Sequence, residues 1–274
     1  MTRSFAMAVR GTGLLLALSL SGCSTPMTPP VDAGCDVMFG RPVEGRTGLN
    51  STQCGPSCTC NNKKVDSLEF TQARFDELLS WQLETPLAEL TSNPYDAPVP
   101  KRDEGVCAMV VTDKAAKKYK LQTFATVEEV TAAGATLTHH DACGVCSTLQ
   151  DFVVYAKDPD LGAPVRKCGV DTFAKGFEED VKCLQALGFT RPCAQIWAYN
   201  TQNTRGACFE PCLRINEFPY HLPDGRLNEC LQCDENKSGP IFKAVGGRTR
   251  RNTGVASSIC RPCGEARPVS HAYP

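Results

Sequence analysis

The sequence predicts an α+β fold that is dominated by helices, contains a small β-sheet and is rich in disulfides. Residues 106–157 alternate between strand-like and helix-like patterns, and after residue 168 apolar residues recur mostly at helical spacing. The chain also has 17 cysteines. Setting aside the one that ends the N-terminal leader leaves an even number, and in an exported chain this indicates disulfides.

Residues 1–22 have the features of a secretory signal peptide. Two arginines and no acid precede an apolar run, residues 13–20, that is too short to span a bilayer. The run ends in Leu20-Ser21-Gly22-Cys23, which resembles the lipobox of bacterial lipoproteins. The resemblance implies a diacylglyceryl group on the Cys23 thiol, cleavage before it and acylation of the new amine, and the following Ser24 favours the outer membrane. An ordinary signal peptide with a cysteine at its cleavage site is the alternative.

Residues 23–34 are predicted to be a flexible tether, because they contain three prolines and no apolar periodicity. Residues 35–274 are then the cysteine-rich globular part, which is long enough for a real core. The formal net charge is −1, and both signs are mixed along the chain without a basic stripe for nucleic acid. We therefore expect attachment to a membrane through the lipid, no nucleic-acid partner and no cofactor.

The first part of the globular region is predicted to be poor in regular structure. Residues 35–62 form a loop-rich lobe in which Cys54, Cys58 and Cys60 are crowded between glycines. Residues 66–84 then carry leucines and a phenylalanine at roughly helical spacing, and Pro86 ends this helix. Residues 93–100 contain three prolines and are predicted to be a connector.

Residues 106–157 are predicted to run in the order ββαβα. Residues 106–111 and 119–124 have strand patterns, and Thr126 with Glu129 is a capping box that opens a helix. Residues 135–139 alternate as a third strand, and residues 147–150 are a second capping-box pattern that opens the next helix.

Residues 168–263 are predicted to be helical and stapled by disulfides. Four apolar residues recur at helical spacing: Phe173, Phe177, Val181 and Leu184. Pro192 suits the first turn of a helix that reaches about residue 205, and further helices are expected over residues 227–235 and 240–245.

The candidate site is the segment from His139 to Ser147, which reads His-His-Asp-Ala-Cys-Gly-Val-Cys-Ser and lies where a strand leads into a helix. Backbone amides at a helix N-terminus stabilise a thiolate. Cys143 and Cys146 are therefore predicted to be catalytic, with His140 tuning the thiol or accepting its proton. We expect the two cysteines to bond each other or to stay free.

The Cys-Gly-Val-Cys turn resembles the redox motif of thioredoxin-like proteins, in which the first cysteine attacks a disulfide and the second resolves it. It also resembles papain-like proteases, where the second cysteine of such a motif at a helix start is the nucleophile. His140 occupies the position of that family's oxyanion-hole glutamine. The alternative is that Cys143 and Cys146 each pair elsewhere as structural disulfides.

Two further motifs are candidate binding sites. Cys230-Leu231-Gln232-Cys233 and Cys260-Arg261-Pro262-Cys263 resemble a zinc ribbon, although disulfides are favoured over zinc in an oxidising compartment. Arg248, Arg250 and Arg251, in a glycine-containing segment, are predicted to hold an anionic small molecule. The alternative for these arginines is a solvated basic turn or pairing with nearby acids.

The function that the sequence favours is thiol chemistry, redox or nucleophilic, in a lipid-anchored extracytoplasmic protein. One alternative is a non-catalytic binding or scaffold lipoprotein in which all 16 remaining cysteines are structural. Another is a metal-binding protein that uses Cys143 and Cys146 with His139 or His140. The sequence leaves open whether the chain is an enzyme.

Overall fold

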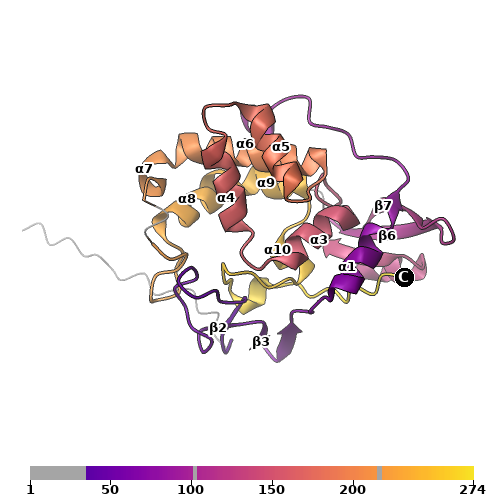
Figure 1. Cartoon of the computed structure of the whole chain (residues 1–274). Coiled ribbons are helices and arrows are strands. Elements are labelled where there is room, and N and C mark those ends of the chain that lie inside the picture. The colour runs from indigo at the N-terminus through magenta and orange to yellow at the C-terminus, as the bar shows by residue number, and fades with distance from the viewer. Residues whose placement is uncertain (1–34, 101–103, 215–217) are drawn as a thin grey trace, which may run out of the picture.

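A computed structural model describes residues 35–100, 104–214 and 218–274 (Figure 1). The predicted signal peptide, Cys23 and the tether lie outside these residues. Within them helices dominate, accompanied by one four-stranded sheet, two two-stranded sheets and eight disulfides, which confirms the predicted α+β, disulfide-rich fold. None of the described helices is both long enough and apolar enough to cross a membrane.

The four-stranded sheet has the order β5-β7-β6-β8. Its strands are β5 (Gln82–Leu83), β6 (Val106–Asp113), β7 (Lys118–Phe124) and β8 (Thr136–His140). Strand β6 pairs antiparallel with both β7 and β8, and β5 adds to β7 in parallel. Helix α2 (Val127–Ala132) joins β7 to β8, and Thr126 caps it by accepting from the Glu129 amide. With α3 (Leu149–Lys157), the stretch has the order ββαβα that the sequence indicates.

The helix expected over residues 66–84 is shorter in the structure. Helix α1 spans Gln72–Leu79, because Thr71 caps its N-terminus and both flanks of the predicted range pair as strands. Helix α1 packs against α3. Between them lies an aromatic-rich core that includes Phe75, Trp81 and Phe152.

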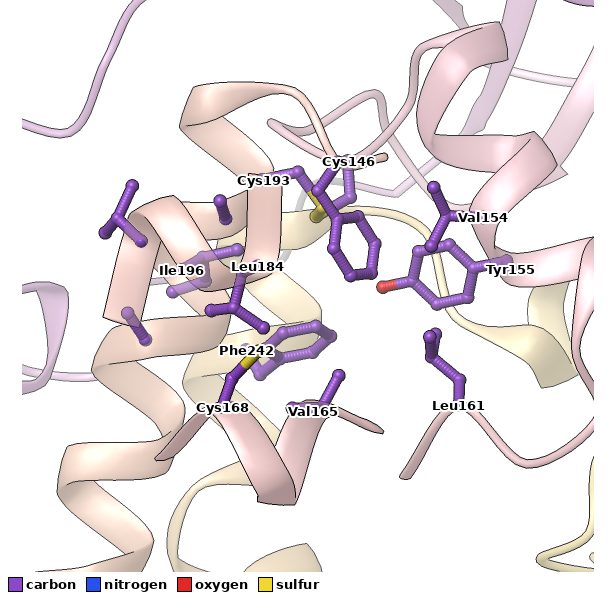
Figure 2. Close-up of a cluster of buried hydrophobic side chains, with 14 residues drawn as sticks. Cys146, Val154, Tyr155, Leu161, Val165, Cys168, Leu184, Cys193, Ile196 and Phe242 are labelled. Atoms are coloured by element: carbon purple, nitrogen blue, oxygen red, sulfur yellow. A yellow bond between two sulfur atoms is a disulfide. The ribbon is translucent and has the colours of Figure 1, made fainter. Parts of the chain in front are cut away.

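The helical part is arranged around α6 (Arg191–Ala207), which contacts its neighbours on several sides. The other elements are α4 (Gly162–Asp171), α5 (Phe177–Ala186), α7 (Phe209–Cys212), α8 (Glu229–Lys237), α9 (Gly239–Gly246), α10 (Arg250–Thr253) and the 3₁₀ turns η1 (Pro94–Asp96) and η3 (Cys263–Glu265). Their core surrounds the Cys146–Cys193 disulfide and includes Tyr155 and Phe242 (Figure 2). The predicted helical run from Phe173 to Leu184 is broken at Gly176, whose φ is 93°, so Phe173 lies outside α5.

The N-terminal lobe, which in the structure extends over residues 35–66, contains only short strands. These are β1 (Met38–Phe39), β2 (Cys54–Gly55), β3 (Ser57–Cys60) and β4 (Lys63–Asp66), paired as β1-β2 and β3-β4. Two disulfides, Cys54–Cys260 and Cys58–Cys263, fasten the lobe to the C-terminal part of the chain. As these two disulfides require, the lobe (indigo in Figure 1) lies beside the C-terminal segment (yellow).

Candidate functional site

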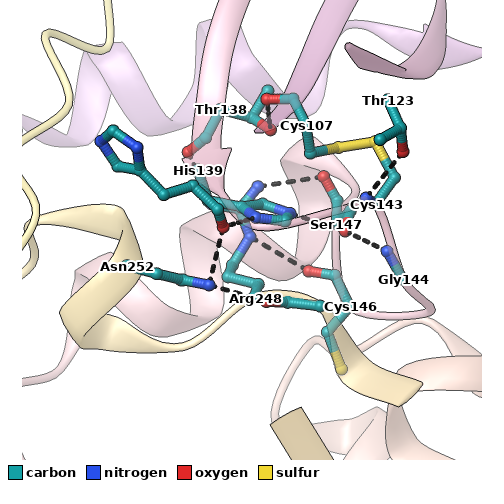
Figure 3. Close-up of a disulfide and its surroundings, with 12 residues drawn as sticks. Cys107, Thr123, Thr138, His139, Cys143, Gly144, Cys146, Ser147, Arg248 and Asn252 are labelled. Carbon is teal, nitrogen blue, oxygen red and sulfur yellow. Dashed lines mark hydrogen bonds between the residues drawn. A yellow bond between two sulfur atoms is a disulfide. The ribbon is translucent and has the colours of Figure 1, made fainter. Parts of the chain in front are cut away.

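Cys143 and Cys146 are bonded to two different, distant cysteines, so the expectation of a local disulfide or free thiols is wrong. Cys143 bonds Cys107, and Cys146 bonds Cys193 (Figure 3 shows the first disulfide). Strand β6 lies beside β8 and places Cys107 opposite His139, close to the loop that carries Cys143. The first turn of α6 brings Cys193 to Cys146, and both cysteines are fully buried. The predicted redox or nucleophilic pair is therefore two structural disulfides.

The histidines and Ser147 are also engaged in the fold. The His139 Nδ1 lies 2.7 Å from the His140 carbonyl, so Nδ1 carries the hydrogen and Nε2 is left to accept from the Ser147 hydroxyl at 2.7 Å. The Ser147 oxygen in turn accepts from the Gly144 amide at 2.8 Å. His139 and Ser147 are both fully buried, so this serine–histidine pair is out of reach of a substrate.

The capping-box pattern at residues 147–150 predicts that Ser147 is the N-cap of the next helix, and this is wrong by one residue. Thr148 is the N-cap of α3, and its side chain accepts from the Asp151 amide. The His140 ring, partly buried, bonds the Pro268 carbonyl at 3.3 Å, and burial lowers the pKa of His140. With Cys143 and Cys146 oxidised, His140 has no thiol to deprotonate.

The three predicted anion-binding arginines are committed to contacts within the chain. Arg248 is fully buried, donates to the carbonyls of Thr138, Cys146 and Ser147 at 3.0–3.2 Å, and lies over the Phe152 ring. Arg250 donates to the carbonyls of Asp158 and Ala256. Arg251 forms ion pairs with Glu235 and Glu265. These contacts lend no support to the prediction of an anionic ligand at the three arginines, and Arg251 pairs with nearby acids, which is the alternative that the sequence leaves open.

The structure does bring the two glycine-containing motifs together. The Val145 and Cys146 amides donate to the Val245 and Gly246 carbonyls at 3.0 Å. A side chain on Gly144 would collide with this backbone at 2.4 Å, and Gly247 has φ of 73° and a similarly close contact. The glycines thus permit one backbone to approach another, and the motifs form a buried junction.

The two Cys-x-x-Cys pairs near the C-terminus do not form a zinc ribbon. Their cysteines bond four other partners: Cys230–Cys212, Cys233–Cys208, Cys260–Cys54 and Cys263–Cys58. In the residues that the structure describes, no group of three or more histidine, cysteine or acidic side chains is arranged to hold a metal ion.

A cleft of about 600 Å³ lies between the sheet and the first turns of α3 and α6, and no pattern in the sequence indicates it. An extended segment, residues 84–90, borders it and is called the strap here. The strap is fastened at one end by the Glu84 amide to the Tyr119 carbonyl, and at the other by the Leu90 amide to the Gln195 side chain, both at 2.8 Å. In Figure 1 this segment leaves the sheet and runs to the side of α6.

The cleft combines an apolar lining with uncharged hydrogen-bonding groups. Its apolar contributors include Leu79, Leu83, Pro86, Leu87 and Phe189. The side-chain amides of Gln82 and Gln185 also line it and have no hydrogen-bond partner among the described residues. Its charged lining residues, Glu89 and Arg191, neutralise each other in an ion pair of 2.7 Å. A cavity of this size and mixture is typical of small-molecule sites.

Beneath the cleft, a buried carboxylate holds the two helix starts in place. Asp151 accepts from the Thr190 amide and from the hydroxyls of Thr148 and Thr190 at 2.6–3.1 Å. Both threonines line the cleft. Burial raises the pKa of Asp151 to about 6. Asp151 therefore fixes the floor of the cleft. The hydroxyls of Thr148 and Thr190 donate to its carboxylate, so they do not donate to a ligand.

A family model described as "Family of unknown function (DUF8771)" matches residues 177–268. This range includes α5, α6 and Arg248, and so one wall of the cleft, but neither the strap nor the loop of Cys143. No curated protein and no solved structure matches the chain.

Proposed function

We propose that the chain is a non-catalytic binding lipoprotein of the outer membrane, anchored through Cys23, that holds a small uncharged ligand in the cleft under the strap. One observation carries the proposal. All 16 cysteines after Cys23 form disulfides, so the thiols of a redox or nucleophilic site are not present.

Eight disulfides also support the extracytoplasmic location, because they persist in oxidising compartments and are rare in the cytosol. The lipobox resemblance at Leu20–Cys23 supports the anchor. The extracytoplasmic location and the lipid anchor are both part of the proposal.

The lining of the cleft supports an uncharged ligand with an apolar body. The Glu89–Arg191 pair leaves no unmatched charge on the lining, whereas the amides of Gln82 and Gln185 offer both donors and acceptors. The walls contributed by Leu83 and Leu87 suit an apolar surface.

The thiol content tests the non-catalytic assignment. Iodoacetamide applied to the oxidised protein, both folded and denatured without reductant, is expected to alkylate none of its cysteines, and mass spectrometry would read the result. Alkylation of Cys143 or Cys146 in the folded protein would restore the thiol site as the better hypothesis.

The cleft is tested with Nile red, a neutral fluorophore. The protein is expected to bind it saturably at one site, and Leu87→Trp, which fills the cleft, should weaken binding by about tenfold or more, equivalent to about 1.4 kcal/mol. Val99→Trp is the matched control, because Val99 is exposed and does not line the cleft. Equal affinities in all three proteins would contradict the cleft as the binding site.

A further inference from the structure

The walls of the cleft differ in how firmly they are held. Asp151 ties the first turns of α3 and α6 together, and another wall belongs to the hydrogen-bonded sheet. The strap, in contrast, is irregular, and in the part of the chain that the structure describes residues 85–89 make no backbone hydrogen bond. Segments with few hydrogen bonds and little buried apolar surface open at the lowest free energy, so the strap is the wall that can yield.

The side chains of the strap are also largely outside the core. Thr85, Pro86, Ala88 and Glu89 are exposed. Leu87 is only partly buried and belongs to none of the buried apolar clusters of the described residues. Pro86, Leu87 and Glu89 nevertheless line the cleft, so the strap forms one wall along most of its own length.

The chain is fixed on both sides of this stretch. Before it, the Glu84 amide donates to the Tyr119 carbonyl next to β5. After it, in η1, the Tyr95 hydroxyl donates to the Asn200 side chain of α6 at 2.8 Å. Residues 85–94 lie between these two points and can move without disturbing either.

Between the two fixed points, Glu89 and Leu90 attach the strap to α6. The Glu89 carboxylate accepts from the Arg191 Nε at 2.7 Å. The Gln195 side chain accepts from the Leu90 amide at 2.8 Å, and donates to the Leu90 carbonyl and the Glu89 carboxylate at 3.4 Å. Residues four apart lie on the same face of a helix, so Arg191 and Gln195 make one attachment, which is called the latch here.

Arg191 has a second acidic partner that does not belong to the strap. Its Nη2 lies 3.0 Å from the Glu178 carboxylate in α5, and the neighbouring Glu179 is paired with Lys182. Opening the strap therefore leaves Arg191 paired, and it releases a Glu89 side chain that is already 53 % exposed to water. The latch can thus open without leaving a buried charge unpaired.

We propose that the strap is the gate of the cleft, which moves away from α6 to admit and release the ligand and is closed by the latch. The inference rests on the proposed function, because it takes the cleft to hold a ligand. Loop motions of this kind set how fast a ligand exchanges. A latch that acts alike on the empty and the occupied cleft changes the association and dissociation rates by the same factor and leaves the dissociation constant unchanged.

Stopped-flow fluorescence with Nile red measures both rates. Glu89→Gln is expected to raise them alike, by about two- to fivefold, the range that the strength of an exposed ion pair allows. Raising the salt concentration should speed exchange in the unaltered protein more than in this variant, because salt screens the exposed pair.

Glu178→Gln is the matched control, since it removes the other partner of Arg191 but leaves the strap attached. It should not speed exchange. Equal rates in Glu89→Gln and Glu178→Gln would overturn the gate. A change in the dissociation rate alone would also overturn it, because Glu89 would then contact the ligand directly.

Hydrogen exchange tests the latch without a ligand. The Leu90 amide, which donates to Gln195 within the latch, should exchange faster in Glu89→Gln than in the unaltered protein or in Glu178→Gln, while the amides of β6 and β7 stay unchanged. If Nile red does not bind the unaltered protein, the proposed function fails, and faster exchange at Leu90 would still support an opening strap. Equal exchange at Leu90 in the three proteins would overturn the gate whether or not Nile red binds.

Discussion

The N-terminal lobe and the body of the molecule, meaning the four-stranded sheet with helices α3 to α6, are held together in different ways. The lobe buries few large apolar side chains, chiefly Phe39, Leu49 and Val65, and its small clusters are otherwise largely cystines and alanines. The body buries two clusters rich in aromatic and branched residues. Disulfides in the body close 15 to 47 residues of chain, whereas those joining the lobe to the C-terminal part close 205 and 206.

This difference indicates that covalent bonds define the lobe and packing defines the body. A strand of two residues cannot sustain a sheet, and the lobe has two such strands. The lobe should therefore be most sensitive to loss of disulfides, and the body to unpaired polar groups and charge in its core.

The largest expected effect comes from removing both disulfides between the lobe and the C-terminal part. With either one intact, Cys54–Cys260 or Cys58–Cys263, the other closes a loop of only about nine residues and its loss costs about 2.5 kcal/mol. Without both, the remaining disulfides leave a loop of about 100 residues, and the total cost rises to about 7 kcal/mol. Replacing all four cysteines by alanine should therefore release the lobe, while either pair alone should not.

Hydrogen exchange of the amides in residues 38–66 measures this opening. Replacing Cys168 and Cys183 by alanine is the control, because that disulfide joins α4 to α5 inside the helical part. If the two single-pair costs add up to the cost of removing both, the shared-loop explanation is wrong.

The contrast between the lobe and the body also explains which features could be predicted from the sequence and which could not. The order ββαβα and the Thr126 cap are local patterns of side chains, and the structure has both. Disulfide pairing is not local. Cys143 and Cys107 are 36 residues apart and meet only because β6 and β8 are neighbours in the sheet. A Cys-x-x-Cys spacing looks the same whether its cysteines bond each other or distant partners.

The arginines of the predicted site show the same limit, which is that a local sequence pattern does not reveal which distant residues a side chain contacts. Arg248 and Arg251 are three residues apart in a basic segment, yet one is fully buried under three carbonyls and the other forms ion pairs at a partly exposed position. No local feature distinguishes them. The cleft was missed because its lining residues come from four stretches that lie far apart in the chain, namely residues 79–89, 119, 148–150 and 185–192.

The second prediction acts on the body. Arg248→Met should lower the free energy of unfolding by about 3–5 kcal/mol, because it leaves buried carbonyls of Thr138, Cys146 and Ser147 without their donor. Arg251→Met is the matched control and should cost about 1 kcal/mol, since Glu235 keeps Lys243 and Arg261. Urea unfolding of the two variants gives the comparison. Similar losses would mean that Arg248 does not hold the junction.

The smallest expected effect is a pH dependence of the body that the lobe should not share. His271 stacks on Phe152 and bonds the Thr253 carbonyl, and burial lowers its pKa to about 3. The unfolded chain therefore takes up this proton first, near pH 6.5, while the folded chain stays neutral. Stability from His271 is complete above about pH 7.5 and falls as the pH decreases, by about 2 kcal/mol between pH 6.5 and 4.5.

Asp151 acts in the opposite direction over the same range, because its raised pKa lets the folded chain bind a proton before the unfolded one. The contribution of His271 must therefore be taken as a difference between proteins. His271→Gln should be less stable than the unaltered chain at pH 7 but should lose less stability on acidification to pH 4.5. The partly exposed His140→Gln should change this slope much less, because its ring lies at the edge of the fold on the Pro268 carbonyl. If acidification lowers the unfolding free energy equally in the His271→Gln variant and the unaltered protein, buried histidine does not make the body sensitive to acid.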